Sequence, residues 1–210
     1  MVGERSRRAH GATSCEPGHV HSRCPRPTHR CPSLRPDAPT VTRRVLVTGS
    51  EGLIGTALRP VLVDAGFTVD GLDLRATGAD HGDIRDRGRV RDAVREVDGI
   101  VHLAAVSRVV WGEQDPATCR ATNVGALHAL LEAVAERSTP PWVLFASSRE
   151  VYGQPDRLPA GEDAPLGPVN VYGRSKVEGE RAIREAGESG LRTTAVRLSN
   201  VYGPASDHAD

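Results

Sequence analysis

The chain has 210 residues, a length that suits one domain or one domain with an appendage. Its 27 basic and 27 acidic residues cancel, so no global field would recruit nucleic acid or an acidic membrane. No apolar run approaches the roughly 20 residues that span a bilayer, and none follows Arg7 and Arg8 as in an export signal. Its four cysteines offer no disulfide framework, which predicts a cytoplasmic protein in a reducing compartment.

Residues 1–42 differ in composition from the rest of the chain. They hold six prolines, seven arginines and four histidines but only three acidic residues, so they cannot bury enough apolar surface to offset their ordering entropy. Their potential metal ligands do not follow any usual zinc spacing; these are His19, His21, Cys24, His29 and Cys31. We expect a disordered tail without a metal, and Val41–Arg44 as a plausible true start of the protein.

Strands and helices alternate after residue 42. The short apolar run Val45–Val47 is typical of a strand buried on both faces of a parallel sheet. Further strands are predicted at 67–72, 83–84, 100–103, 142–145 and 194–198, and helices at 53–65, 87–97, 116–136 and 171–188. This alternation predicts an α/β fold for residues 43–210: a Rossmann-type doubly wound parallel sheet that binds ligands at the carboxyl ends of its strands.

A glycine-rich turn, TGSEGLIG, joins the first strand to the first helix. Gly49, Gly52 and Gly55 permit a tight turn, close approach of a pyrophosphate to the backbone and close helix–strand packing. The first helical residues, Leu53 and Ile54, would present free N–H groups to the phosphates. The position between a strand and a helix is the context that this motif requires.

Asp73 ends the second predicted strand, 24 residues beyond Gly49. A carboxylate there can accept hydrogen bonds from both ribose hydroxyls and would repel a 2′-phosphate, which favours NAD over NADP. Arg75 weakens this preference because it could pair with such a phosphate. The alternative for Asp73 is a loop carboxylate without a ligand.

Lys176 is the only lysine of the chain. It follows Tyr172 by four residues, and on a helix this spacing puts both side chains on one face. A lysine ammonium is a compact charge that can be partly desolvated, whereas arginine is a wide, permanently charged fork. Spacing alone leaves an ordinary exposed lysine as an equal alternative.

Eight segments together resemble the extended short-chain dehydrogenase/reductases, specifically the NAD-dependent epimerase/dehydratase family that acts on nucleotide sugars. They are TGSEGLIG at 48–55, LDLR at 72–75, GDIRD at 82–86, HLAA at 102–105, TNVGALHALLEA at 122–133, SSREVYG at 147–153, NVYGRSK at 170–176 and RLSNVYGP at 197–204. The resemblance implies NAD as the cofactor and a nucleotide sugar as the substrate. It leaves a homodimer open.

The resemblance also implies roles for single residues. Besides the glycine turn, the expected cofactor contacts are Asp73 and Arg75, the adenine pair Asp83 and Ile84, the strip Leu103, Ala104 and Ala105 under the ribose, Asn123 in the cofactor channel, and Tyr172 and Lys176. On the substrate side, Ser148 matches the active-site hydroxyl and Asn200 a residue near the diphosphate. For His102 we prefer plain core packing, and for Tyr152 and Tyr202 packing or a place in the substrate wall.

In this family a hydride leaves a sugar carbon while a base takes the neighbouring hydroxyl proton. Tyr172 would be that base, with its pKa lowered by the Lys176 cation and bound NAD⁺. Ser148 would hold the sugar oxygen. In the 4,6-dehydratases an acid and a glutamate follow the matching hydroxyl. Here they are Arg149 and Glu150, which disfavours dehydration because an arginine does not donate a proton usefully.

We therefore expect an epimerase acting at C4. The alternatives are a keto-sugar reductase, a dehydratase or decarboxylase of the same family, and a non-catalytic NAD-binding module. For Glu150, a surface residue without chemistry is an equal alternative to a substrate contact. Family members continue well beyond the segment that ends at Pro204, and their later residues form most of a substrate domain. The sequence thus predicts a truncated chain whose last strand is an exposed edge.

Overall fold

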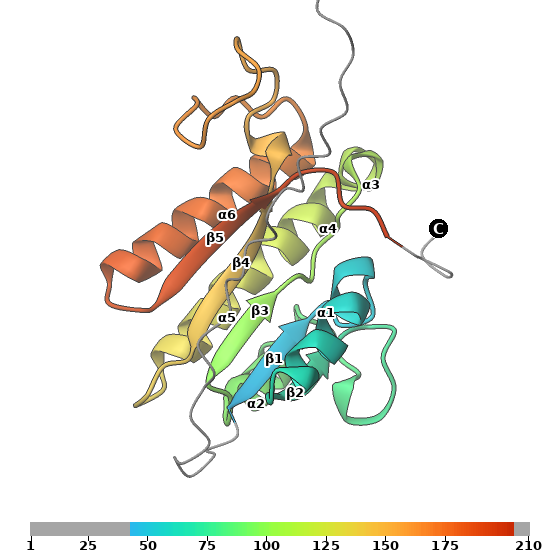
Figure 1. The fold of residues 1–210 in the computed structure, drawn as a ribbon, viewed down its shortest axis with the longest axis vertical. Coiled ribbons are helices and arrows are strands. Elements are labelled where there is room, and N and C mark those ends of the chain that lie inside the picture. The colour runs from blue at the N-terminus through green and yellow to red at the C-terminus, as the bar shows by residue number, and fades with distance from the viewer. Residues whose placement is uncertain (1–42, 204–210) are drawn as a thin grey trace, which may run out of the picture. The chain divides into compact units, whose positions relative to one another are not determined.

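A computed structural model describes residues 43–203, so the predicted tail at 1–42 lies outside the described residues. The strands form one parallel sheet in the order β2-β1-β3-β4-β5 (Figure 1). Their bounds are Arg44–Thr48 for β1, Thr68–Leu72 for β2, Gly99–His102 for β3, Trp142–Ser148 for β4 and Thr193–Leu198 for β5. The sheet with its flanking helices confirms the predicted Rossmann-type α/β class. The strand order reverses between β1 and β3, where ligands of such sheets bind.

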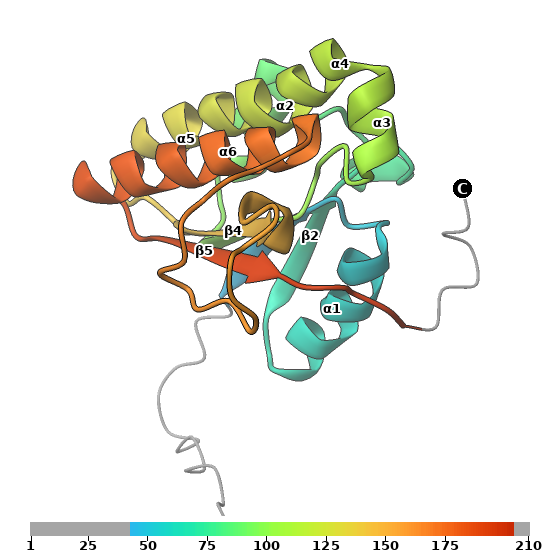
Figure 2. The same ribbon diagram turned by 90° about the horizontal axis from the view of Figure 1, so that it is seen from above.

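Helices cover the two faces of the sheet unequally (Figure 2). Among the described elements, α1 (Leu53–Asp64) lies on one face, while α2 (Arg87–Val94), α5 (Ala126–Ala135) and α6 (Val171–Glu188) lie on the other. The larger core cluster joins the strands to α2, α5 and α6 and includes Leu46, Ile100 and Phe145. Val45 and Val47 belong to the smaller cluster with α1. Alternate residues of β1 thus point to opposite faces, and Val45–Val47 are all buried, which explains this continuous apolar run.

The strand predicted at 83–84 was wrong. The chain makes one isolated bridge between Asp73 and His81 and then turns, because the N–H of Asp86 donates to the carbonyl of Asp83 at 3.0 Å. The Asp83 carboxylate accepts from the backbone N–H of Arg85 at 2.8 Å. Local bonds of this kind compete with strand pairing. The described sheet therefore has five strands instead of six.

The helix predicted at 116–136 is three segments. A short α4 (Pro116–Arg120) is followed by a π-helical turn (Ala121–Gly125) and then by α5. Asp115 caps α4 by accepting from the N–H of Thr118 at 2.9 Å, and Pro116 occupies its first turn. A helix that the sequence did not predict, α3 (Val109–Gln114), precedes it.

The last strand, β5, is an edge of the sheet among the described residues. Three consecutive residues, Thr194–Val196, are exposed, and the side chain of Val196 is 38% exposed. Within residues 43–203, no helix combines the length and the apolarity that a membrane crossing requires.

Candidate functional site

The glycine turn depends on close backbone contacts. Gly49 has φ +70°, a left-handed conformation, and a Cβ there would lie 2.8 Å from the backbone nitrogen of Ala104. A Cβ at Gly55 would overlap the carbonyl oxygen of Gly49, and one at Gly52 would lie 3.1 Å from the same oxygen. Gly49 and Gly55 therefore leave no room for a side chain, and a Cβ at Gly52 would be tightly placed.

The first helix begins directly behind this turn. Its N-cap is Gly52, and no side chain caps it. The backbone N–H groups of the first helical turn, which includes Leu53 and Ile54, therefore lack a side-chain acceptor. Their partial positive charge suits an anion such as a diphosphate. Both residues are half-buried at the foot of the helix.

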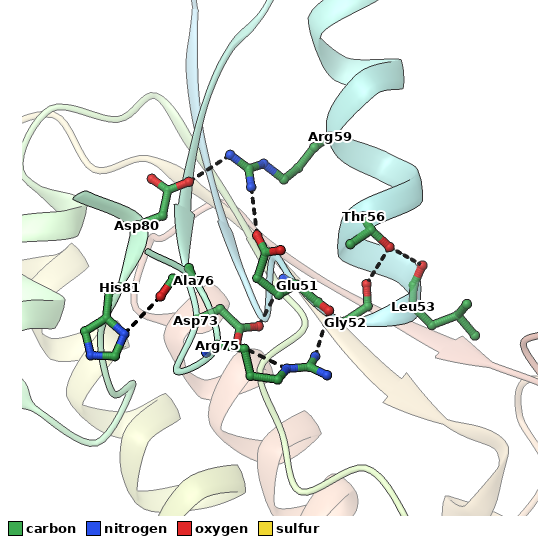
Figure 3. Close-up of polar contacts among 10 residues, drawn as sticks. All are labelled: Glu51, Gly52, Leu53, Thr56, Arg59, Asp73, Arg75, Ala76, Asp80 and His81. Atoms are coloured by element: carbon green, nitrogen blue, oxygen red, sulfur yellow. Dashed lines mark hydrogen bonds and ion pairs between the residues drawn. The ribbon is translucent and has the colours of Figure 1, made fainter. Parts of the chain in front are cut away.

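Asp73 and Arg75 both reach the glycine turn (Figure 3). The Asp73 carboxylate accepts from the N–H of Glu51 at 3.0 Å and from the N–H of Arg75 at 2.8 Å. The Arg75 guanidinium donates to the carbonyl of Glu51 at 2.7 Å and lies 3.6 Å from the Asp73 carboxylate. Asp73 is largely buried and Arg75 is 57% exposed. Each Asp73 oxygen keeps a lone pair for another donor.

An ion-pair chain supports the outer side of the turn. Arg59 on α1 donates to Glu51 at 3.0 Å and to Asp80 at 2.8 Å, and all three side chains are about one-third exposed (Figure 3). These two ion pairs connect α1, the glycine turn and the segment after β2. Glu51 is thereby fixed at its side chain by Arg59 and at its backbone by Asp73 and Arg75.

The predicted adenine pair lies beside the end of β2. The N–H of Gly82 donates to the carbonyl of Asp73 at 3.1 Å, which brings Asp83 to this edge. Hydrogen bonds from Arg85 hold the pKa of Asp83 below its usual range, against the effect of burial. Ile84 is 6% exposed and belongs to the larger core cluster. The side chain of Asp83 is therefore committed to Arg85, and a contact of this pair with adenine stays a prediction.

Two buried side chains fix the strip that follows β3. The Thr48 hydroxyl accepts from the N–H of Ala104 at 3.2 Å and lies 2.8 Å from Nδ1 of His102. His102 is 1% exposed, and burial, with the Lys176 charge second, lowers its pKa to about 3. The preference for core packing of His102 agrees with this neutral, buried ring. Leu103, Ala104 and Ala105 themselves are half-buried next to Gly49.

Asn123 lies in the π-helical turn and is 1% exposed. Its Oδ1 accepts from the N–H of Val106 at 2.7 Å, and its Nδ2 donates to the carbonyl of Val106 and to Ser175, at 3.1 and 2.9 Å. Ser175 in turn donates to the carbonyl of Tyr172 at 2.7 Å. The amide thus ties the strip after β3 to α6, and a direct contact of Asn123 with a cofactor stays a prediction.

Tyr172, Lys176 and Ser148 come together where β4 ends and α6 begins. Lys176 is 3% exposed. Its ammonium donates to the carbonyl of Ala146 at 2.8 Å and lies 4.7 Å from the ring centre of Phe145 and 5.7 Å from that of Tyr172. Lys176 is therefore no ordinary exposed lysine. Ser148, the last residue of β4, is 9% exposed and lies close enough to Tyr172 to lower the pKa of its phenol.

The pKa of Tyr172 is raised in the protein alone, so the lowered pKa expected with bound NAD⁺ stays a prediction. Burial raises this pKa, the Ser148 hydrogen bond lowers it and the charge of Glu150 raises it. Lys176, whose ammonium donates to the Ala146 carbonyl, is not among the groups that shift this pKa. Burial also lowers the pKa of Lys176 to about 8. The protein groups alone thus keep the Tyr172 phenol protonated.

Two residues that the sequence did not single out fix the start of α6. Asn170 is its N-cap and accepts from the N–H of Gly173 at 2.6 Å, while its Nδ2 donates to the Glu150 carboxylate at 2.8 Å. Glu113 on α3 accepts from the N–H of Val171 at 2.7 Å. An asparagine directly before a helical run is a capping signal that was readable. The contact of Glu113 with Val171 could not be predicted from the sequence, because 58 residues separate the two.

The remaining predicted positions differ in their surroundings. Glu150 is about one-quarter exposed and lies 3.6 Å from the exposed Arg149. Asn200, two residues beyond β5, is exposed and stands outside the cluster. Tyr152 packs under the Arg197 guanidinium at 4.8 Å, in agreement with a packing role. Tyr202 is 92% exposed, so it does not pack against the described residues.

The parallel sheet, the uncapped helix behind a glycine turn and the acidic residue after β2 define a Rossmann-type dinucleotide-binding fold. Residues 45–210 match the model of the NAD dependent epimerase/dehydratase family, and the chain belongs to this family.

Similar proteins include a UDP-glucose 4-epimerase of Streptomyces lividans, 36% identical over 76% of this chain and 53% of its own length. The structure of a UDP-glucose 4-epimerase from Brucella ovis in complex with NAD is 33% identical, with a TM-score of 0.70 over 76% of this chain and 52% of that one. MoeE5 in complex with UDP-glucuronic acid and NAD is 30% identical, with a TM-score of 0.70 over 77% and 56%. The chain spans about half the length of the curated relatives it matches.

Proposed function

We propose that this chain binds NAD along the glycine turn and the ends of β2 and β3. The donor set supports this: an uncapped helix N-terminus for the diphosphate, and the Asp73 carboxylate for the ribose hydroxyls. The NAD complex of the relative from Brucella ovis supports it as well. Arg75 is paired with Asp73 and Glu51, so a 2′-phosphate would have to displace these contacts. NAD is therefore the favoured cofactor.

The proposed reaction is the epimerisation of a nucleotide sugar at C4. Bound NAD supplies a reversible hydride acceptor. Tyr172, ionised when the positive charges of Lys176 and bound NAD⁺ offset its burial, takes the proton of the sugar hydroxyl. Ser148 holds the same oxygen and later the keto oxygen. The single observation that carries this proposal is that Tyr172 lies beside the buried Ser148 and Lys176 at the carboxyl end of β4.

The substrate class rests on the relatives. The curated relatives are UDP-glucose 4-epimerases, and MoeE5 was crystallised with UDP-glucuronic acid. Arg149 stands where a dehydratase needs an acid, and it is exposed and paired with Glu150. This favours epimerisation over dehydration. Asn200 remains a proposed contact of the diphosphate.

The test measures conversion of UDP-glucose to its C4 epimer by the purified chain, together with calorimetric titration of NAD and NADP. We expect conversion without added reduced cofactor, tighter binding of NAD than of NADP, and a Tyr172→Phe variant that loses turnover but keeps its NAD affinity. Turnover by the Phe variant would refute the role of Tyr172. Tighter binding of NADP would refute the role of Asp73.

Two other outcomes distinguish the alternatives. Stoichiometric consumption of reduced cofactor with a keto-sugar would indicate a reductase. Binding of NAD without turnover of any nucleotide sugar would indicate a binding module. In both cases the cofactor part of the proposal stands and the epimerase part fails.

A further inference from the structure

A cluster of polar side chains around Arg197 lies beside the Tyr172 site without belonging to it. Arg197, on β5, donates through Nε and Nη2 to the two carboxylate oxygens of Glu180, each at 2.8 Å. Its Nη1 donates to the Tyr152 hydroxyl at 2.7 Å and to the carbonyl of Glu162 at 2.8 Å. Ser147 donates to the same Glu180 carboxylate. We call these five residues the Arg197 cluster.

The pairing between Arg197 and Glu180 is partly buried and geometrically specific. The two side chains are 25% and 11% exposed, so both charges are partly removed from water. A planar guanidinium that binds two carboxylate oxygens in parallel is stronger and more directional than a single-point ion pair. A lysine could keep the charge but could not hold Glu180, Tyr152 and Glu162 at once.

The cluster holds both flanks of one short segment. Ser147 directly precedes Ser148, and Tyr152 follows Glu150 by two residues. Both flanking side chains are bonded to the Arg197–Glu180 pair. Glu180 lies four residues after Lys176, on the same face of α6. The segment between the flanks is thereby fixed against the helix that carries Tyr172.

The Glu162 carbonyl extends this connection to the loop of residues 153–170. This loop leads from β4 to α6 and is drawn in orange at the top of Figure 1. The N–H of Gly167 donates back to the carbonyl of Val151 at 3.1 Å, so the loop is attached to the same segment a second time. Arg197 is the one residue of the cluster that bonds the helix, the segment and the loop together.

We propose that Arg197 is a positioning residue, which holds residues 148–150 and the 153–170 loop in register with Tyr172 without touching the reacting groups. The importance of this register rests on the proposed function, because Ser148, Glu150 and Tyr172 are the proposed site. The register itself is a property of the protein alone and is measurable without cofactor or turnover.

Amide hydrogen exchange by NMR on the full chain tests this positioning. The reporters are the N–H groups of Glu150, Tyr152, Gly153 and Gly167, all of which donate within this region. Arg197→Lys should accelerate their exchange about tenfold or more, since charge-assisted bonds are lost locally. Amides of β1 and α5 should change far less. Tyr152→Phe removes a single hydroxyl acceptor and should give a smaller effect at the same amides.

A second readout is the ¹³Cζ signal of Tyr172, which should move in both variants although Tyr172 shares no hydrogen bond with either residue. Arg91→Met is the matched control, because it removes an arginine from an exposed pair on α2.

Uniform acceleration of amide exchange throughout the chain would make Arg197 a general stabiliser and overturn the proposal. Unchanged exchange at the reporter amides would overturn it as well. If Arg197→Lys does not fold, amide exchange and the Tyr172 signal in Tyr152→Phe alone test the proposal. NAD affinity should be unchanged in Tyr152→Phe, so a failure of cofactor binding in the parent chain is distinguishable from a failure of this proposal.

Discussion

The glycine turn after β1 and the first half of α6 are stabilised by different kinds of contact. The turn is made of backbone: three glycines, an uncapped helix start, and a carboxylate that accepts from main-chain N–H groups. The start of α6 is held by side chains, namely Asn170, Glu113 and Ser175, and carries a buried cation. Local chain geometry therefore determines the first region, and packing between distant segments determines the second.

This difference predicts how each region fails. A backbone turn fails when a side chain is added, since the contacts leave no room for it. A region held by buried polar groups fails when a partner is removed, because the remaining group is left desolvated. Four substitutions separate these two kinds of failure, and they are given in order of expected effect.

Gly49→Ala should have the largest effect. Its Cβ would meet the backbone of Ala104 in addition to the unfavourable φ of +70°. We expect NAD affinity to fall about 10- to 100-fold, with a loss of stability of about 2–5 kcal/mol. Gly66→Ala is the control, because φ there is +88° and nothing lies within 4 Å of the added Cβ. It should lose only about 1–2 kcal/mol and keep its NAD affinity. Equal effects of the two substitutions on NAD affinity, in calorimetry, and on stability, in urea unfolding, would show that the contact of residue 49 with Ala104 does not matter.

Lys176→Met should change the pH dependence of stability. The folded protein releases the Lys176 proton near pH 8, whereas the unfolded chain keeps it up to about pH 10.4. Between these values the unfolded state binds more protons, so the free energy of unfolding rises with pH. Urea titrations measure the free energy of unfolding of both proteins. From pH 7.5 to pH 10.5, that of the wild type should rise relative to that of Lys176→Met by on the order of 2–3 kcal/mol. A constant difference between the two proteins would contradict the desolvation of Lys176.

Asn170→Ala should cost about 1 kcal/mol, because it removes the cap on Gly173 and the partner of Glu150. Asn170→Ser provides the comparison, since serine can cap the helix but is too short to reach Glu150. We expect Asn170→Ser to recover most of the stability in urea unfolding. If serine is as destabilising as alanine, the Glu150 contact rather than the cap stabilises this end of α6.

Arg91→Met should have the smallest effect. Arg91 pairs with Glu136 at 3.1 Å, and both side chains are more than half exposed. Such pairs contribute little, and we expect a change below about 0.5 kcal/mol in the free energy of unfolding. A loss larger than that of Asn170→Ala would show that pairs between α2 and α5 stabilise the fold more than the site contacts do.

The same contrast explains what the sequence predicted. The glycine turn and the ends of β1, β2 and α6 follow from spacing and apolar runs over a few residues, and they lie where they were expected. The strand at 83–84 failed because a side-chain turn at Asp83 outcompeted pairing. The long helix at 116–136 failed because apolar periodicity does not register a π-helical turn.

The residues that contact the Tyr172 helix could not be predicted from the sequence. Glu113 lies in a helix that was not predicted and meets Val171 from 58 residues away. Tyr152 and Arg197 are 45 residues apart and were not connected. The lowered pKa expected for Tyr172 considered Lys176 and bound NAD⁺ but not the burial of the phenol, which raises this pKa. Only the fold reveals this burial and the bond of the ammonium to the Ala146 carbonyl.

The sole lysine permits the most direct test of the account. Chain labelled with ¹⁵N-lysine has one side-chain signal, that of Lys176, which can be followed during titration with NAD and, separately, with NADP. The account predicts that the signal moves to saturation with NAD, at a dissociation constant that matches calorimetry, and that NADP acts only at higher concentration. A Lys176 signal that stays in place while NAD is saturating, or no binding of NAD at all, would contradict a cofactor site formed by the glycine turn and the Tyr172 helix.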